Sequence, residues 1–282
     1  MLYAFWQVPC VRPRFPAMRK ILLIITTLLA TVGISAADAL PGLKAEYLIE
    51  DADLEGPGIE KLAGWLPVPE TGINHSFSRR HYYVKAELTA GPNRFDGLLE
   101  IPFNRLRRVD LVEKTAGGTF TVTHNGANVA MSRRPLRHSA ALFPVALEAG
   151  ARRIFYLHIA SDTSIKIQLK LRTQTGFFQQ HADNMIFYGI YSGLFLLMII
   201  YNLILFWAFR EKSYLTYLMT NIAGLVYYLA FDGIWAQYIM PDSPRLAHAT
   251  LATASLFQSG SYLIFIAQFA PVRRQSAVLH YA

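Results

Sequence analysis

The pattern of hydrophobic and polar residues changes abruptly near residue 185. From there, three segments without Asp, Glu, Lys or Arg follow one another, separated by short polar connections. A helix needs about 20 predominantly apolar residues to cross the hydrocarbon core of a bilayer. Each segment reaches that length, so we expect three transmembrane helices, at 185–209, 213–231 and 246–270.

Between residues 40 and 176 the pattern is that of short β-strands. Segment 164–171 alternates polar and apolar residues with period two, which places one side of a strand on a core. The dipeptide Asn125-Gly126 predicts a tight hairpin. No amphipathic helix separates the segments, so we expect an all-β sandwich or jelly roll over residues 40–176. The predicted strands are 82–88, 97–101, 109–113, 119–123, 153–159 and 164–171.

The first 39 residues have the organisation of a secretory signal peptide. Basic Arg19 and Lys20 precede an apolar run at 21–34, which small residues follow. The run is shorter than a membrane-spanning helix, which favours cleavage over anchoring. We therefore expect a signal peptide over residues 1–39, with Met18 as an alternative start, and a periplasmic β domain.

Charges in the connections predict the orientation of the helices. Arg210 and Lys212 separate the first two apolar segments, and two arginines lie in the tail 271–282. The connection 232–245 holds two aspartates and one arginine. Basic residues favour the cytoplasmic side. We expect a bacterial inner-membrane protein whose C-terminal tail is cytoplasmic, which agrees with export of the β domain.

Composition and charge narrow the functional classes. The chain is 53% hydrophobic and 16% charged, against about 25% charged residues in an average soluble domain. A soluble protein is therefore excluded. The net charge of +8 arises partly before residue 21 and partly beside the apolar segments, so we expect no nucleic-acid partner. The single cysteine, Cys10, precedes the predicted mature start, so the exported domain should contain no disulfide.

Candidate chemistry in the outer domain is sparse. The chain has no Gly-rich phosphate loop, no His/Cys cluster with metal-ligand spacing and no nucleophile elbow, so we expect no catalytic residue, no metal site and no cofactor. The densest polar cluster consists of Arg133, Arg134, Arg137 and His138. Its guanidinium groups could bind sugar hydroxyls, carboxylates or phosphates. The alternative is a loop in which the arginines cap carbonyl groups or meet acidic side chains.

Three aromatic residues are candidates for a sugar-binding platform. Trp65, Tyr82 and Tyr83 have rings on which a sugar could stack, although the cores of sandwiches use the same residues. Within the predicted helices, Asn202, Asn221 and Gln258 are polar groups at depth. We expect them to form contacts between helices, where hydrogen bonds contribute about 0.6 to 2 kcal/mol.

The chain resembles a known family in several short stretches. It is similar to the bacterial seven-transmembrane receptors with diverse intracellular signalling modules, in particular those with the type 2 extracellular domain. That resemblance implies a jelly-roll sensor similar to carbohydrate-binding modules, seven helices, and a cytoplasmic output such as a diguanylate cyclase or a histidine kinase. The stretches are HYYVKA at 81–86, RVDL at 108–111, SRRPLRH at 132–138, FP at 143–144, GIYSG at 189–193, YNLILF at 201–206, KSYLTY at 212–217 and DGIWAQY at 232–238.

The leading hypothesis is a receptor that is not an enzyme. A periplasmic small molecule or carbohydrate would bind the β domain, and the lipid-embedded helices would pass the signal to an output domain, a second copy of the chain or a separate cytoplasmic protein. Against the resemblance, the chain stops after three of the seven expected helices, so we expect a truncated receptor. The alternatives are a membrane-anchored carbohydrate-binding module without signalling, an exported carbohydrate-active enzyme, and a non-functional fragment.

Overall fold

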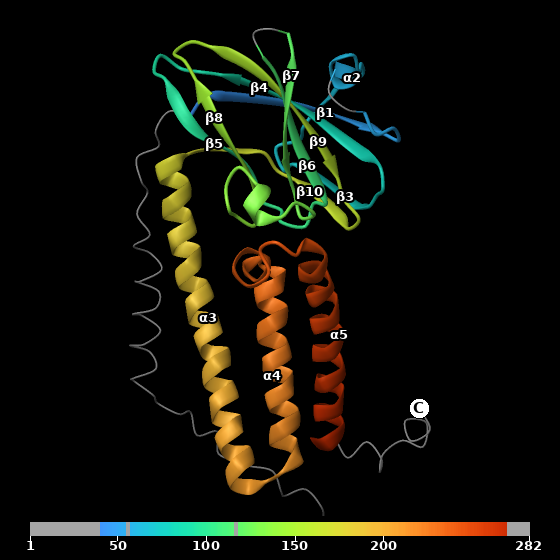
Figure 1. Ribbon diagram of the computed structural model, residues 1–282, viewed down its shortest axis with the longest axis vertical. Coiled ribbons are helices and arrows are strands. Elements are labelled where there is room, and N and C mark those ends of the chain that lie inside the picture. The colour runs from blue at the N-terminus through green and yellow to red at the C-terminus, as the bar shows by residue number, and fades with distance from the viewer. Residues whose placement is uncertain (1–39, 55–56, 116–117, 270–282) are drawn as a thin grey trace, which may run out of the picture. The chain divides into compact units, whose positions relative to one another are not determined.

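The computed structural model describes residues 40–54, 57–115 and 118–269. The predicted signal peptide 1–39, Cys10 and the predicted tail 271–282 lie outside these residues. The described part contains a β domain followed by three long helices (Figure 1). The predicted all-β sandwich followed by membrane helices is confirmed.

One layer of the β domain is a six-stranded antiparallel sheet in the order β2-β1-β4-β9-β6-β7. Along β4 and β9, alternate residues face opposite sides, so one face is apolar and enters the core while the other carries polar side chains. The strands are β1 (Gly42–Glu50), β2 (Leu66–Pro67), β4 (His81–Thr89), β6 (Arg108–Lys114), β7 (Phe120–Asn125) and β9 (Arg152–Ala160).

The opposite layer consists of two smaller sheets, β10-β3 and β11-β5-β8. Their strands are β3 (Ile73–Phe77), β5 (Phe95–Ile101), β8 (Ala141–Leu147), β10 (Ser164–Ile167) and β11 (Lys170–Thr173). The prediction of one strand over 164–171 is wrong, because β10 and β11 pair with different partners. The break has a local cause. Gly72 has a φ of +80° and approaches the backbone of Ile167, while Gln168 donates a hydrogen bond to the Thr71 carbonyl.

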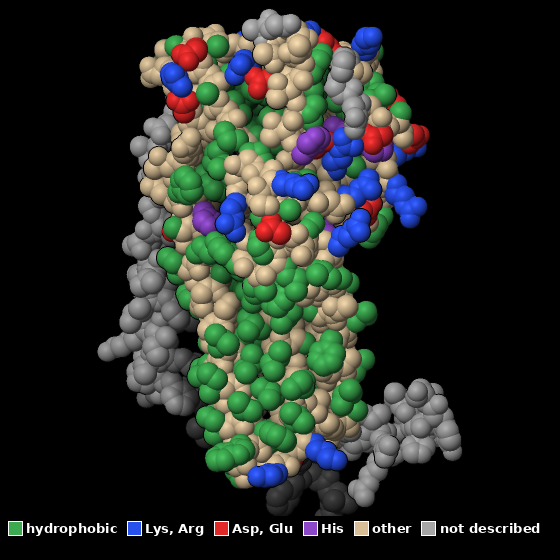
Figure 2. All heavy atoms as spheres, in the orientation of Figure 1, with side chains coloured by type: hydrophobic (Ala, Val, Ile, Leu, Met, Phe, Trp, Pro, Cys, Tyr) green, Lys and Arg blue, Asp and Glu red, His purple; other side chains and the backbone are tan. Residues whose placement is uncertain are grey.

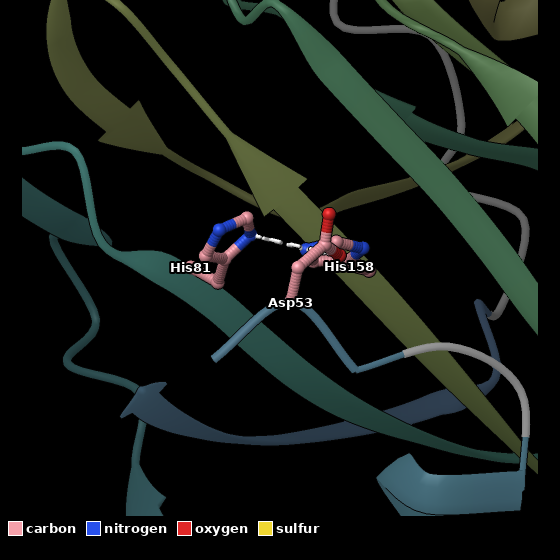
Figure 3. Close-up of side chains that lie close together, drawn as sticks. All are labelled: Asp53, His81 and His158. Atoms are coloured by element: carbon pink, nitrogen blue, oxygen red, sulfur yellow. Dashed lines mark hydrogen bonds and ion pairs between the residues drawn. The ribbon is translucent and has the colours of Figure 1, made fainter. Parts of the chain in front are cut away.

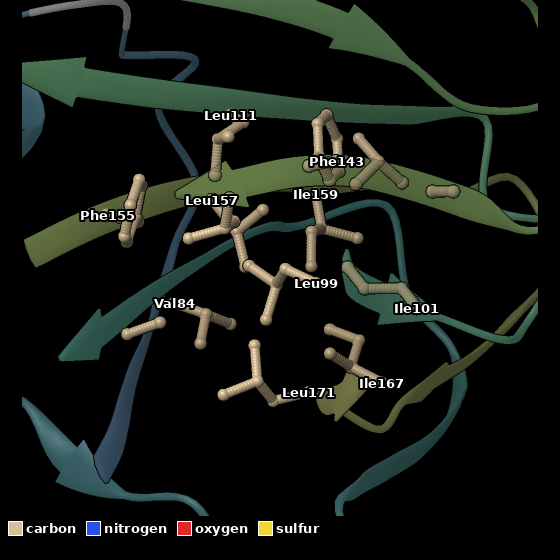
Figure 4. Close-up of a cluster of buried hydrophobic side chains, with 14 of the residues drawn as sticks. Val84, Leu99, Ile101, Leu111, Phe143, Phe155, Leu157, Ile159, Ile167 and Leu171 are labelled. Atoms are coloured by element: carbon tan, nitrogen blue, oxygen red, sulfur yellow. The ribbon is translucent and has the colours of Figure 1, made fainter. Parts of the chain in front are cut away.

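The main core fills the space between the two layers (Figure 4). Val84 and Leu157 come from the large sheet, Leu99 from the opposite layer, and all three are fully buried. Replacing a buried leucine by alanine costs about 2 to 5 kcal/mol. The alternation in 164–171 still serves this core, because Ile165 and Ile167 enter it from β10. The break in that segment therefore changes the pairing but not the buried face.

A second, smaller core lies on the other face of the six-stranded sheet. There Tyr83 and Tyr156 pack against Ile59 and Trp65. Ile59 belongs to the short helix α2 (Pro57–Glu60), and Trp65 follows it. The connection between β1 and β2 therefore covers part of the outer face, which brings its residue Asp53 over the sheet.

Among the described residues, three helices are long and apolar enough to cross a membrane: α3 (Gln174–Phe209), α4 (Lys212–Phe231) and α5 (Pro244–Phe269). Their surface is almost uncharged in the face shown, and Lys and Arg reappear at the far end (Figure 2). The predicted spans 185–209 and 213–231 lie within α3 and α4, and 246–269 lies within α5.

Helix α3 is longer than its predicted span. It has 36 residues, about 54 Å at 1.5 Å per residue, against about 30 Å for a hydrocarbon core. It begins directly after β11, where the Thr173 side chain accepts a hydrogen bond from the Gly176 amide. The predicted end of the β domain at residue 176 therefore falls inside the first turn of the helix. The mostly polar residues 179–184, which lie between the predicted β domain and the predicted first span, are part of this helix.

The connection between β7 and β8, residues 126–140, differs from the predicted hairpin at Asn125-Gly126. β8 pairs with β5 in the opposite layer and not with β7. Asn125 is fully buried, and its side chain donates to the Leu142 carbonyl across the layers. The chain then forms the 3-10 helix η1 (Met131–Arg133) before it returns. We call residues 126–140 the β7–β8 loop.

Candidate functional site

Arg134 organises the β7–β8 loop from within. It is 9% exposed, and its guanidinium donates to the carbonyl oxygens of Val129, His138 and Ser139 at 2.9 to 3.3 Å. Burial lowers the pKa of Arg134 to about 10, so the group remains charged at neutral pH. A charged donor that binds three carbonyls of one loop fixes that loop as a unit.

The π-helix η2 (Trp235–Ile239), which follows α4, holds the same loop through Gln237. The buried amide uses both of its ends: the Ser139 N–H donates to Oε1 at 3.1 Å, and Nε2 donates to the Arg137 carbonyl at 3.3 Å. These bonds lie on either side of His138. The connection between the second and third long helices is thus bound to the β domain, in an arrangement we call the junction.

Further contacts extend the junction on both sides of Gln237. Ser132 donates to the Asp242 carboxylate at 2.6 Å, and the Met131 amide donates to the Pro241 carbonyl at 2.8 Å. Arg105 lies over the ring of Phe231, 4.3 Å from its centroid. Its Nε is buried without a hydrogen-bond partner among the described residues, beside a cavity of about 40 Å³ that is large enough for a water molecule.

Helix α3 contacts the β7–β8 loop through a pair of histidines. His138 Nε2 lies 3.2 Å from Nδ1 of His181. The Ala140 amide donates to His138 Nδ1, so the neutral ring carries its proton on Nε2 and donates it to His181. Burial, and then the neighbouring His181 and Arg134, lower the pKa of His138 to about 4. Phe177 packs edge-on against the His138 ring and adds an apolar contact to the outer face of the β5–β8 sheet.

The predicted ligand cluster therefore lies at or beside the junction. Arg134 caps carbonyl groups, which was the alternative given for this loop, and His138 faces α3. The Arg137 carbonyl binds Gln237, while the side chains of Arg133 and Arg137 are exposed. Ligand binding by the exposed pair stays a prediction.

The structure buries Tyr82 and Tyr83, so neither ring is available for sugar stacking, and sugar binding by the half-buried Trp65 stays a prediction. Tyr82 is 2% exposed and lies in the main core, with its hydroxyl 3.0 Å from His75 Nδ1. Trp65 is half-buried in the second core against Tyr156, and its Nε1 donates to the Leu62 carbonyl. The two cores therefore hold all three rings.

A row of polar side chains crosses the outer face of the six-stranded sheet. Tyr83 on β4 is paired in register with His158 on β9, which is paired with Asp110 on β6, which in turn is paired with His124 on β7. The Tyr83 and His158 rings stack, with centroids 4.8 Å apart. Burial and then the Arg108 charge lower the pKa of His158 to about 4, so its imidazole is neutral at pH 7.

Asp53 and His81 approach His158 at the end of this row (Figure 3). His81 Nδ1 lies 2.8 Å from His158 Nε2, and Asp53 Oδ1 lies 3.9 Å from the former and 3.6 Å from the latter. These three donor atoms have the types and proximity that a metal ion requires. We call Asp53, His81 and His158 the His–Asp cluster.

The neighbours of the cluster are charged. Arg108 donates to the carboxylates of both Asp53 and Asp110, and Asp110 also lies 2.8 Å from His124 Nδ1. Arg108, Asp110, His124 and His158 line a pocket of about 140 Å³ beside the second core. Asp110 is hydrogen-bonded to two of the other polar side chains of this pocket, and apolar residues such as Ile59 and Val112 form the other wall of the pocket.

The polar groups within the helices include two asparagines that bond within their own helix. Asn202 and Asn221 are buried, and among the described residues each donates to a carbonyl four residues earlier in its own helix. Contacts of these two side chains with another helix stay a prediction. Gln258 lies against Gly224 of α4. The helices are bridged by Tyr191, which donates to Asp232 at 2.8 Å, and by Gln268, which donates to Thr216 at 3.0 Å.

Two groups of candidate functional residues were not predicted from the sequence. The His–Asp cluster draws on segments far apart in the chain, so no spacing motif could reveal it. Gln237 was visible only as part of a stretch that carries the family resemblance. The signal that could have found it is a buried amide in a polar connection between two apolar segments.

Two family models match the chain. Residues 44–173 match the one described as 7TMR-DISM extracellular 2, and residues 184–282 match the one described as 7TM diverse intracellular signalling. The first match ends with β11, and the second begins within α3. No curated protein matches the chain.

Proposed function

The chain belongs to the seven-transmembrane receptors of diverse intracellular signalling and carries their type 2 extracellular domain, and from this premise we propose how it transmits a signal. An extracellular ligand changes the β domain, the junction passes that change to the long helices, and the helices pass it to an output domain or a separate cytoplasmic protein. In this proposal the membrane is the bacterial inner membrane, the β domain is periplasmic and the C-terminal tail is cytoplasmic.

The observation that carries the proposal is the clamp by Gln237. A buried amide that saturates a donor and an acceptor of one loop couples the positions of two elements, because motion of either leaves polar groups unsatisfied. A β domain that served only as a binding module on an anchor would need no such contact with the connection between two helices.

The start of α3 supports the same mechanism. β11 pairs with β5 in the sandwich, and α3 begins at the next residue, without a linker. A helix is stiff over this length, so a shift of the β11 edge moves α3 as a body. The sandwich is therefore connected to the helices in two ways: covalently through β11, and by hydrogen bonds that include the Gln237 clamp, the Ser132–Asp242 bond and the His138–His181 pair.

The orientation of the helices in this proposal agrees with the contacts. The connection between α4 and α5 is bound to the extracellular β domain, so the connection at Arg210 and Lys212 would lie on the opposite side of a bilayer. That placement follows the positive-inside rule.

Hydrogen–deuterium exchange of the full chain in lipid nanodiscs tests the coupling. Gln237→Leu removes both bonds of the clamp and leaves the Ser139 amide and the Arg137 carbonyl unsatisfied, which costs about 2 to 4 kcal/mol. We expect local exchange of the β7–β8 loop to accelerate about 30-fold or more, and exchange around Arg210 to change as well.

The matched control is Gln179→Leu, an exposed glutamine near the start of α3, which should leave both regions unchanged. Exchange that accelerates in the β7–β8 loop and η2 but stays unchanged around Arg210 would contradict transmission through the junction. That result would favour a membrane-anchored binding module.

A further inference from the structure

We propose that Asp53, His81 and His158 bind a divalent transition-metal ion of the Zn²⁺ class on the outer face of the β domain. Two imidazole nitrogens and one carboxylate oxygen would be the ligands, which leaves a fourth position for water or a small ligand. This metal site goes beyond receptor function, because metal binding by the three residues is independent of whether the chain signals.

The geometry of the three donor atoms is close to what such an ion requires. With bonds of about 2.0 to 2.2 Å, a tetrahedral ion separates its ligand atoms by about 3.3 Å. The three distances in the cluster are 2.8, 3.6 and 3.9 Å, which lie on both sides of that value. Displacements of about 0.5 Å bring all three donors to bonding distance.

The cluster is held in place before any ion binds. Tyr83 accepts a hydrogen bond from the Leu54 amide at 2.7 Å and donates to the Ala52 carbonyl at 2.9 Å, so one hydroxyl fixes the backbone on both sides of Asp53. The same tyrosine stacks on His158. His81 and His158 come from neighbouring strands of a regular sheet (Figure 3). Ligands on rigid elements with fixed neighbours need little reorganisation.

The charged neighbours suit a metal ligand set. Asp53 Oδ1 is the oxygen that faces the histidines, and Arg108 Nη1 lies 3.2 Å from Oδ2 and 3.4 Å from Oδ1. An ion on Oδ1 would keep the shorter Arg108 contact to Oδ2 as an outer hydrogen bond, as is common in metal sites. Asp53 and Asp110 outweigh the single charge of Arg108. Glu50, paired in register with His81, adds a further negative charge nearby.

The donor types also select the metal. Imidazole nitrogen favours Zn²⁺, Cu²⁺, Ni²⁺ or Co²⁺, whereas Ca²⁺ and Mg²⁺ prefer all-oxygen sites. The competing explanation is a hydrogen bond between the two histidine rings, with Asp53 paired only to Arg108. The two explanations differ in whether the cluster binds a transition ion.

The test uses the purified full chain in nanodiscs, stripped with a chelator and titrated with Co²⁺ and with Zn²⁺. We expect one ion per chain, a d–d absorption typical of nitrogen and oxygen ligands with Co²⁺, and its displacement by Zn²⁺. Asp53→Asn and His81→Ala should each weaken binding at least about tenfold, and Ca²⁺ should not compete.

The matched controls are Asp51→Asn and His75→Ala, which remove an exposed carboxylate and an exposed histidine outside the cluster. They should bind as the unmodified chain does. His158 is left in place because it is buried and its loss could unfold the domain. The proposal is overturned if neither ion binds at one site per chain, or if binding survives both cluster variants. No signalling readout enters the test, so its failure would leave the receptor proposal untouched.

Discussion

Acidification should weaken the packing of the β7–β8 loop through His138. The ring packs against Phe177 and faces His181, with Arg134 bound to the His138 carbonyl. Burial disfavours a positive charge on the ring most strongly, and His181 and Arg134 add to this effect, so the pKa of His138 falls from an ordinary 6.5 to about 4. Between these two values the unfolded chain binds a proton that the folded domain rejects.

The direction and the magnitude of the pH effect on the free energy of unfolding follow from proton linkage. Because the folded pKa lies below the unfolded one, the contribution is complete above about pH 6.5 and is lost as the pH falls toward 4. The two pKa values give a loss of about 2 kcal/mol between pH 7.5 and pH 5. His138 is partly exposed, and solvent screening reduces this figure to about 1 to 2 kcal/mol.

The assay compares the full chain with His138→Asn in nanodiscs, by pulse proteolysis of the β domain in urea at several pH values. Asparagine keeps an acceptor for the Ala140 amide and does not titrate. We expect the unmodified chain to lose about 1 to 2 kcal/mol more than the variant on acidification. The buried His158 is common to both proteins, so its titration cancels. Parallel stability curves would refute the reasoning.

Three other substitutions, with Gly189→Ala as a control, test the junction and the helices. Gly233→Ala introduces a side chain at a φ of +82° against Ser139 and should cost about 1 to 3 kcal/mol in thermal unfolding of the chain in detergent, while Gly189→Ala, in open space on α3, should be neutral. Tyr191→Phe removes a hydrogen bond to a carboxylate and should weaken the bundle by about 1.5 to 3 kcal/mol in unfolding by SDS; an unchanged midpoint would contradict this bond. Asn202→Leu should be nearly neutral in the same assay, because among the described residues the amide donates within its own helix; a loss above about 1 kcal/mol would indicate a contact between helices.

The strands and helices that could be predicted are those whose pattern repeats. Segment 153–159 alternates between two faces, and the structure places Phe155 in the main core and Tyr156 in the second core. The end of 164–171 could not be assigned in this way, because the same alternation fits one strand or two. The approach of Gly72 decides between them, and that contact comes from a turn almost a hundred residues earlier.

The candidate sites were harder to predict, because residue type does not specify direction. Arg134 and Arg133 are adjacent and chemically identical, yet one is buried in its own loop and the other faces solvent. The His–Asp cluster required the register of β4 and β9 together with a covering segment fixed by Tyr83. Neither the strand register nor the position of the covering segment can be inferred from the spacing of neighbouring residues in the sequence.

The uninterrupted passage from Thr173 to Gln174 sets a rule for building chimeras. One inserted residue at this point would turn α3 by about 100° and raise it by about 1.5 Å relative to β11. The His138–His181 pair would then lose its alignment, although every other residue of the sandwich kept its place. An insertion of seven residues nearly restores the helical phase but moves His181 about 10 Å further from β11 along the helix axis. Exchange of the sensor between receptors should therefore preserve both the phase and the residue count here.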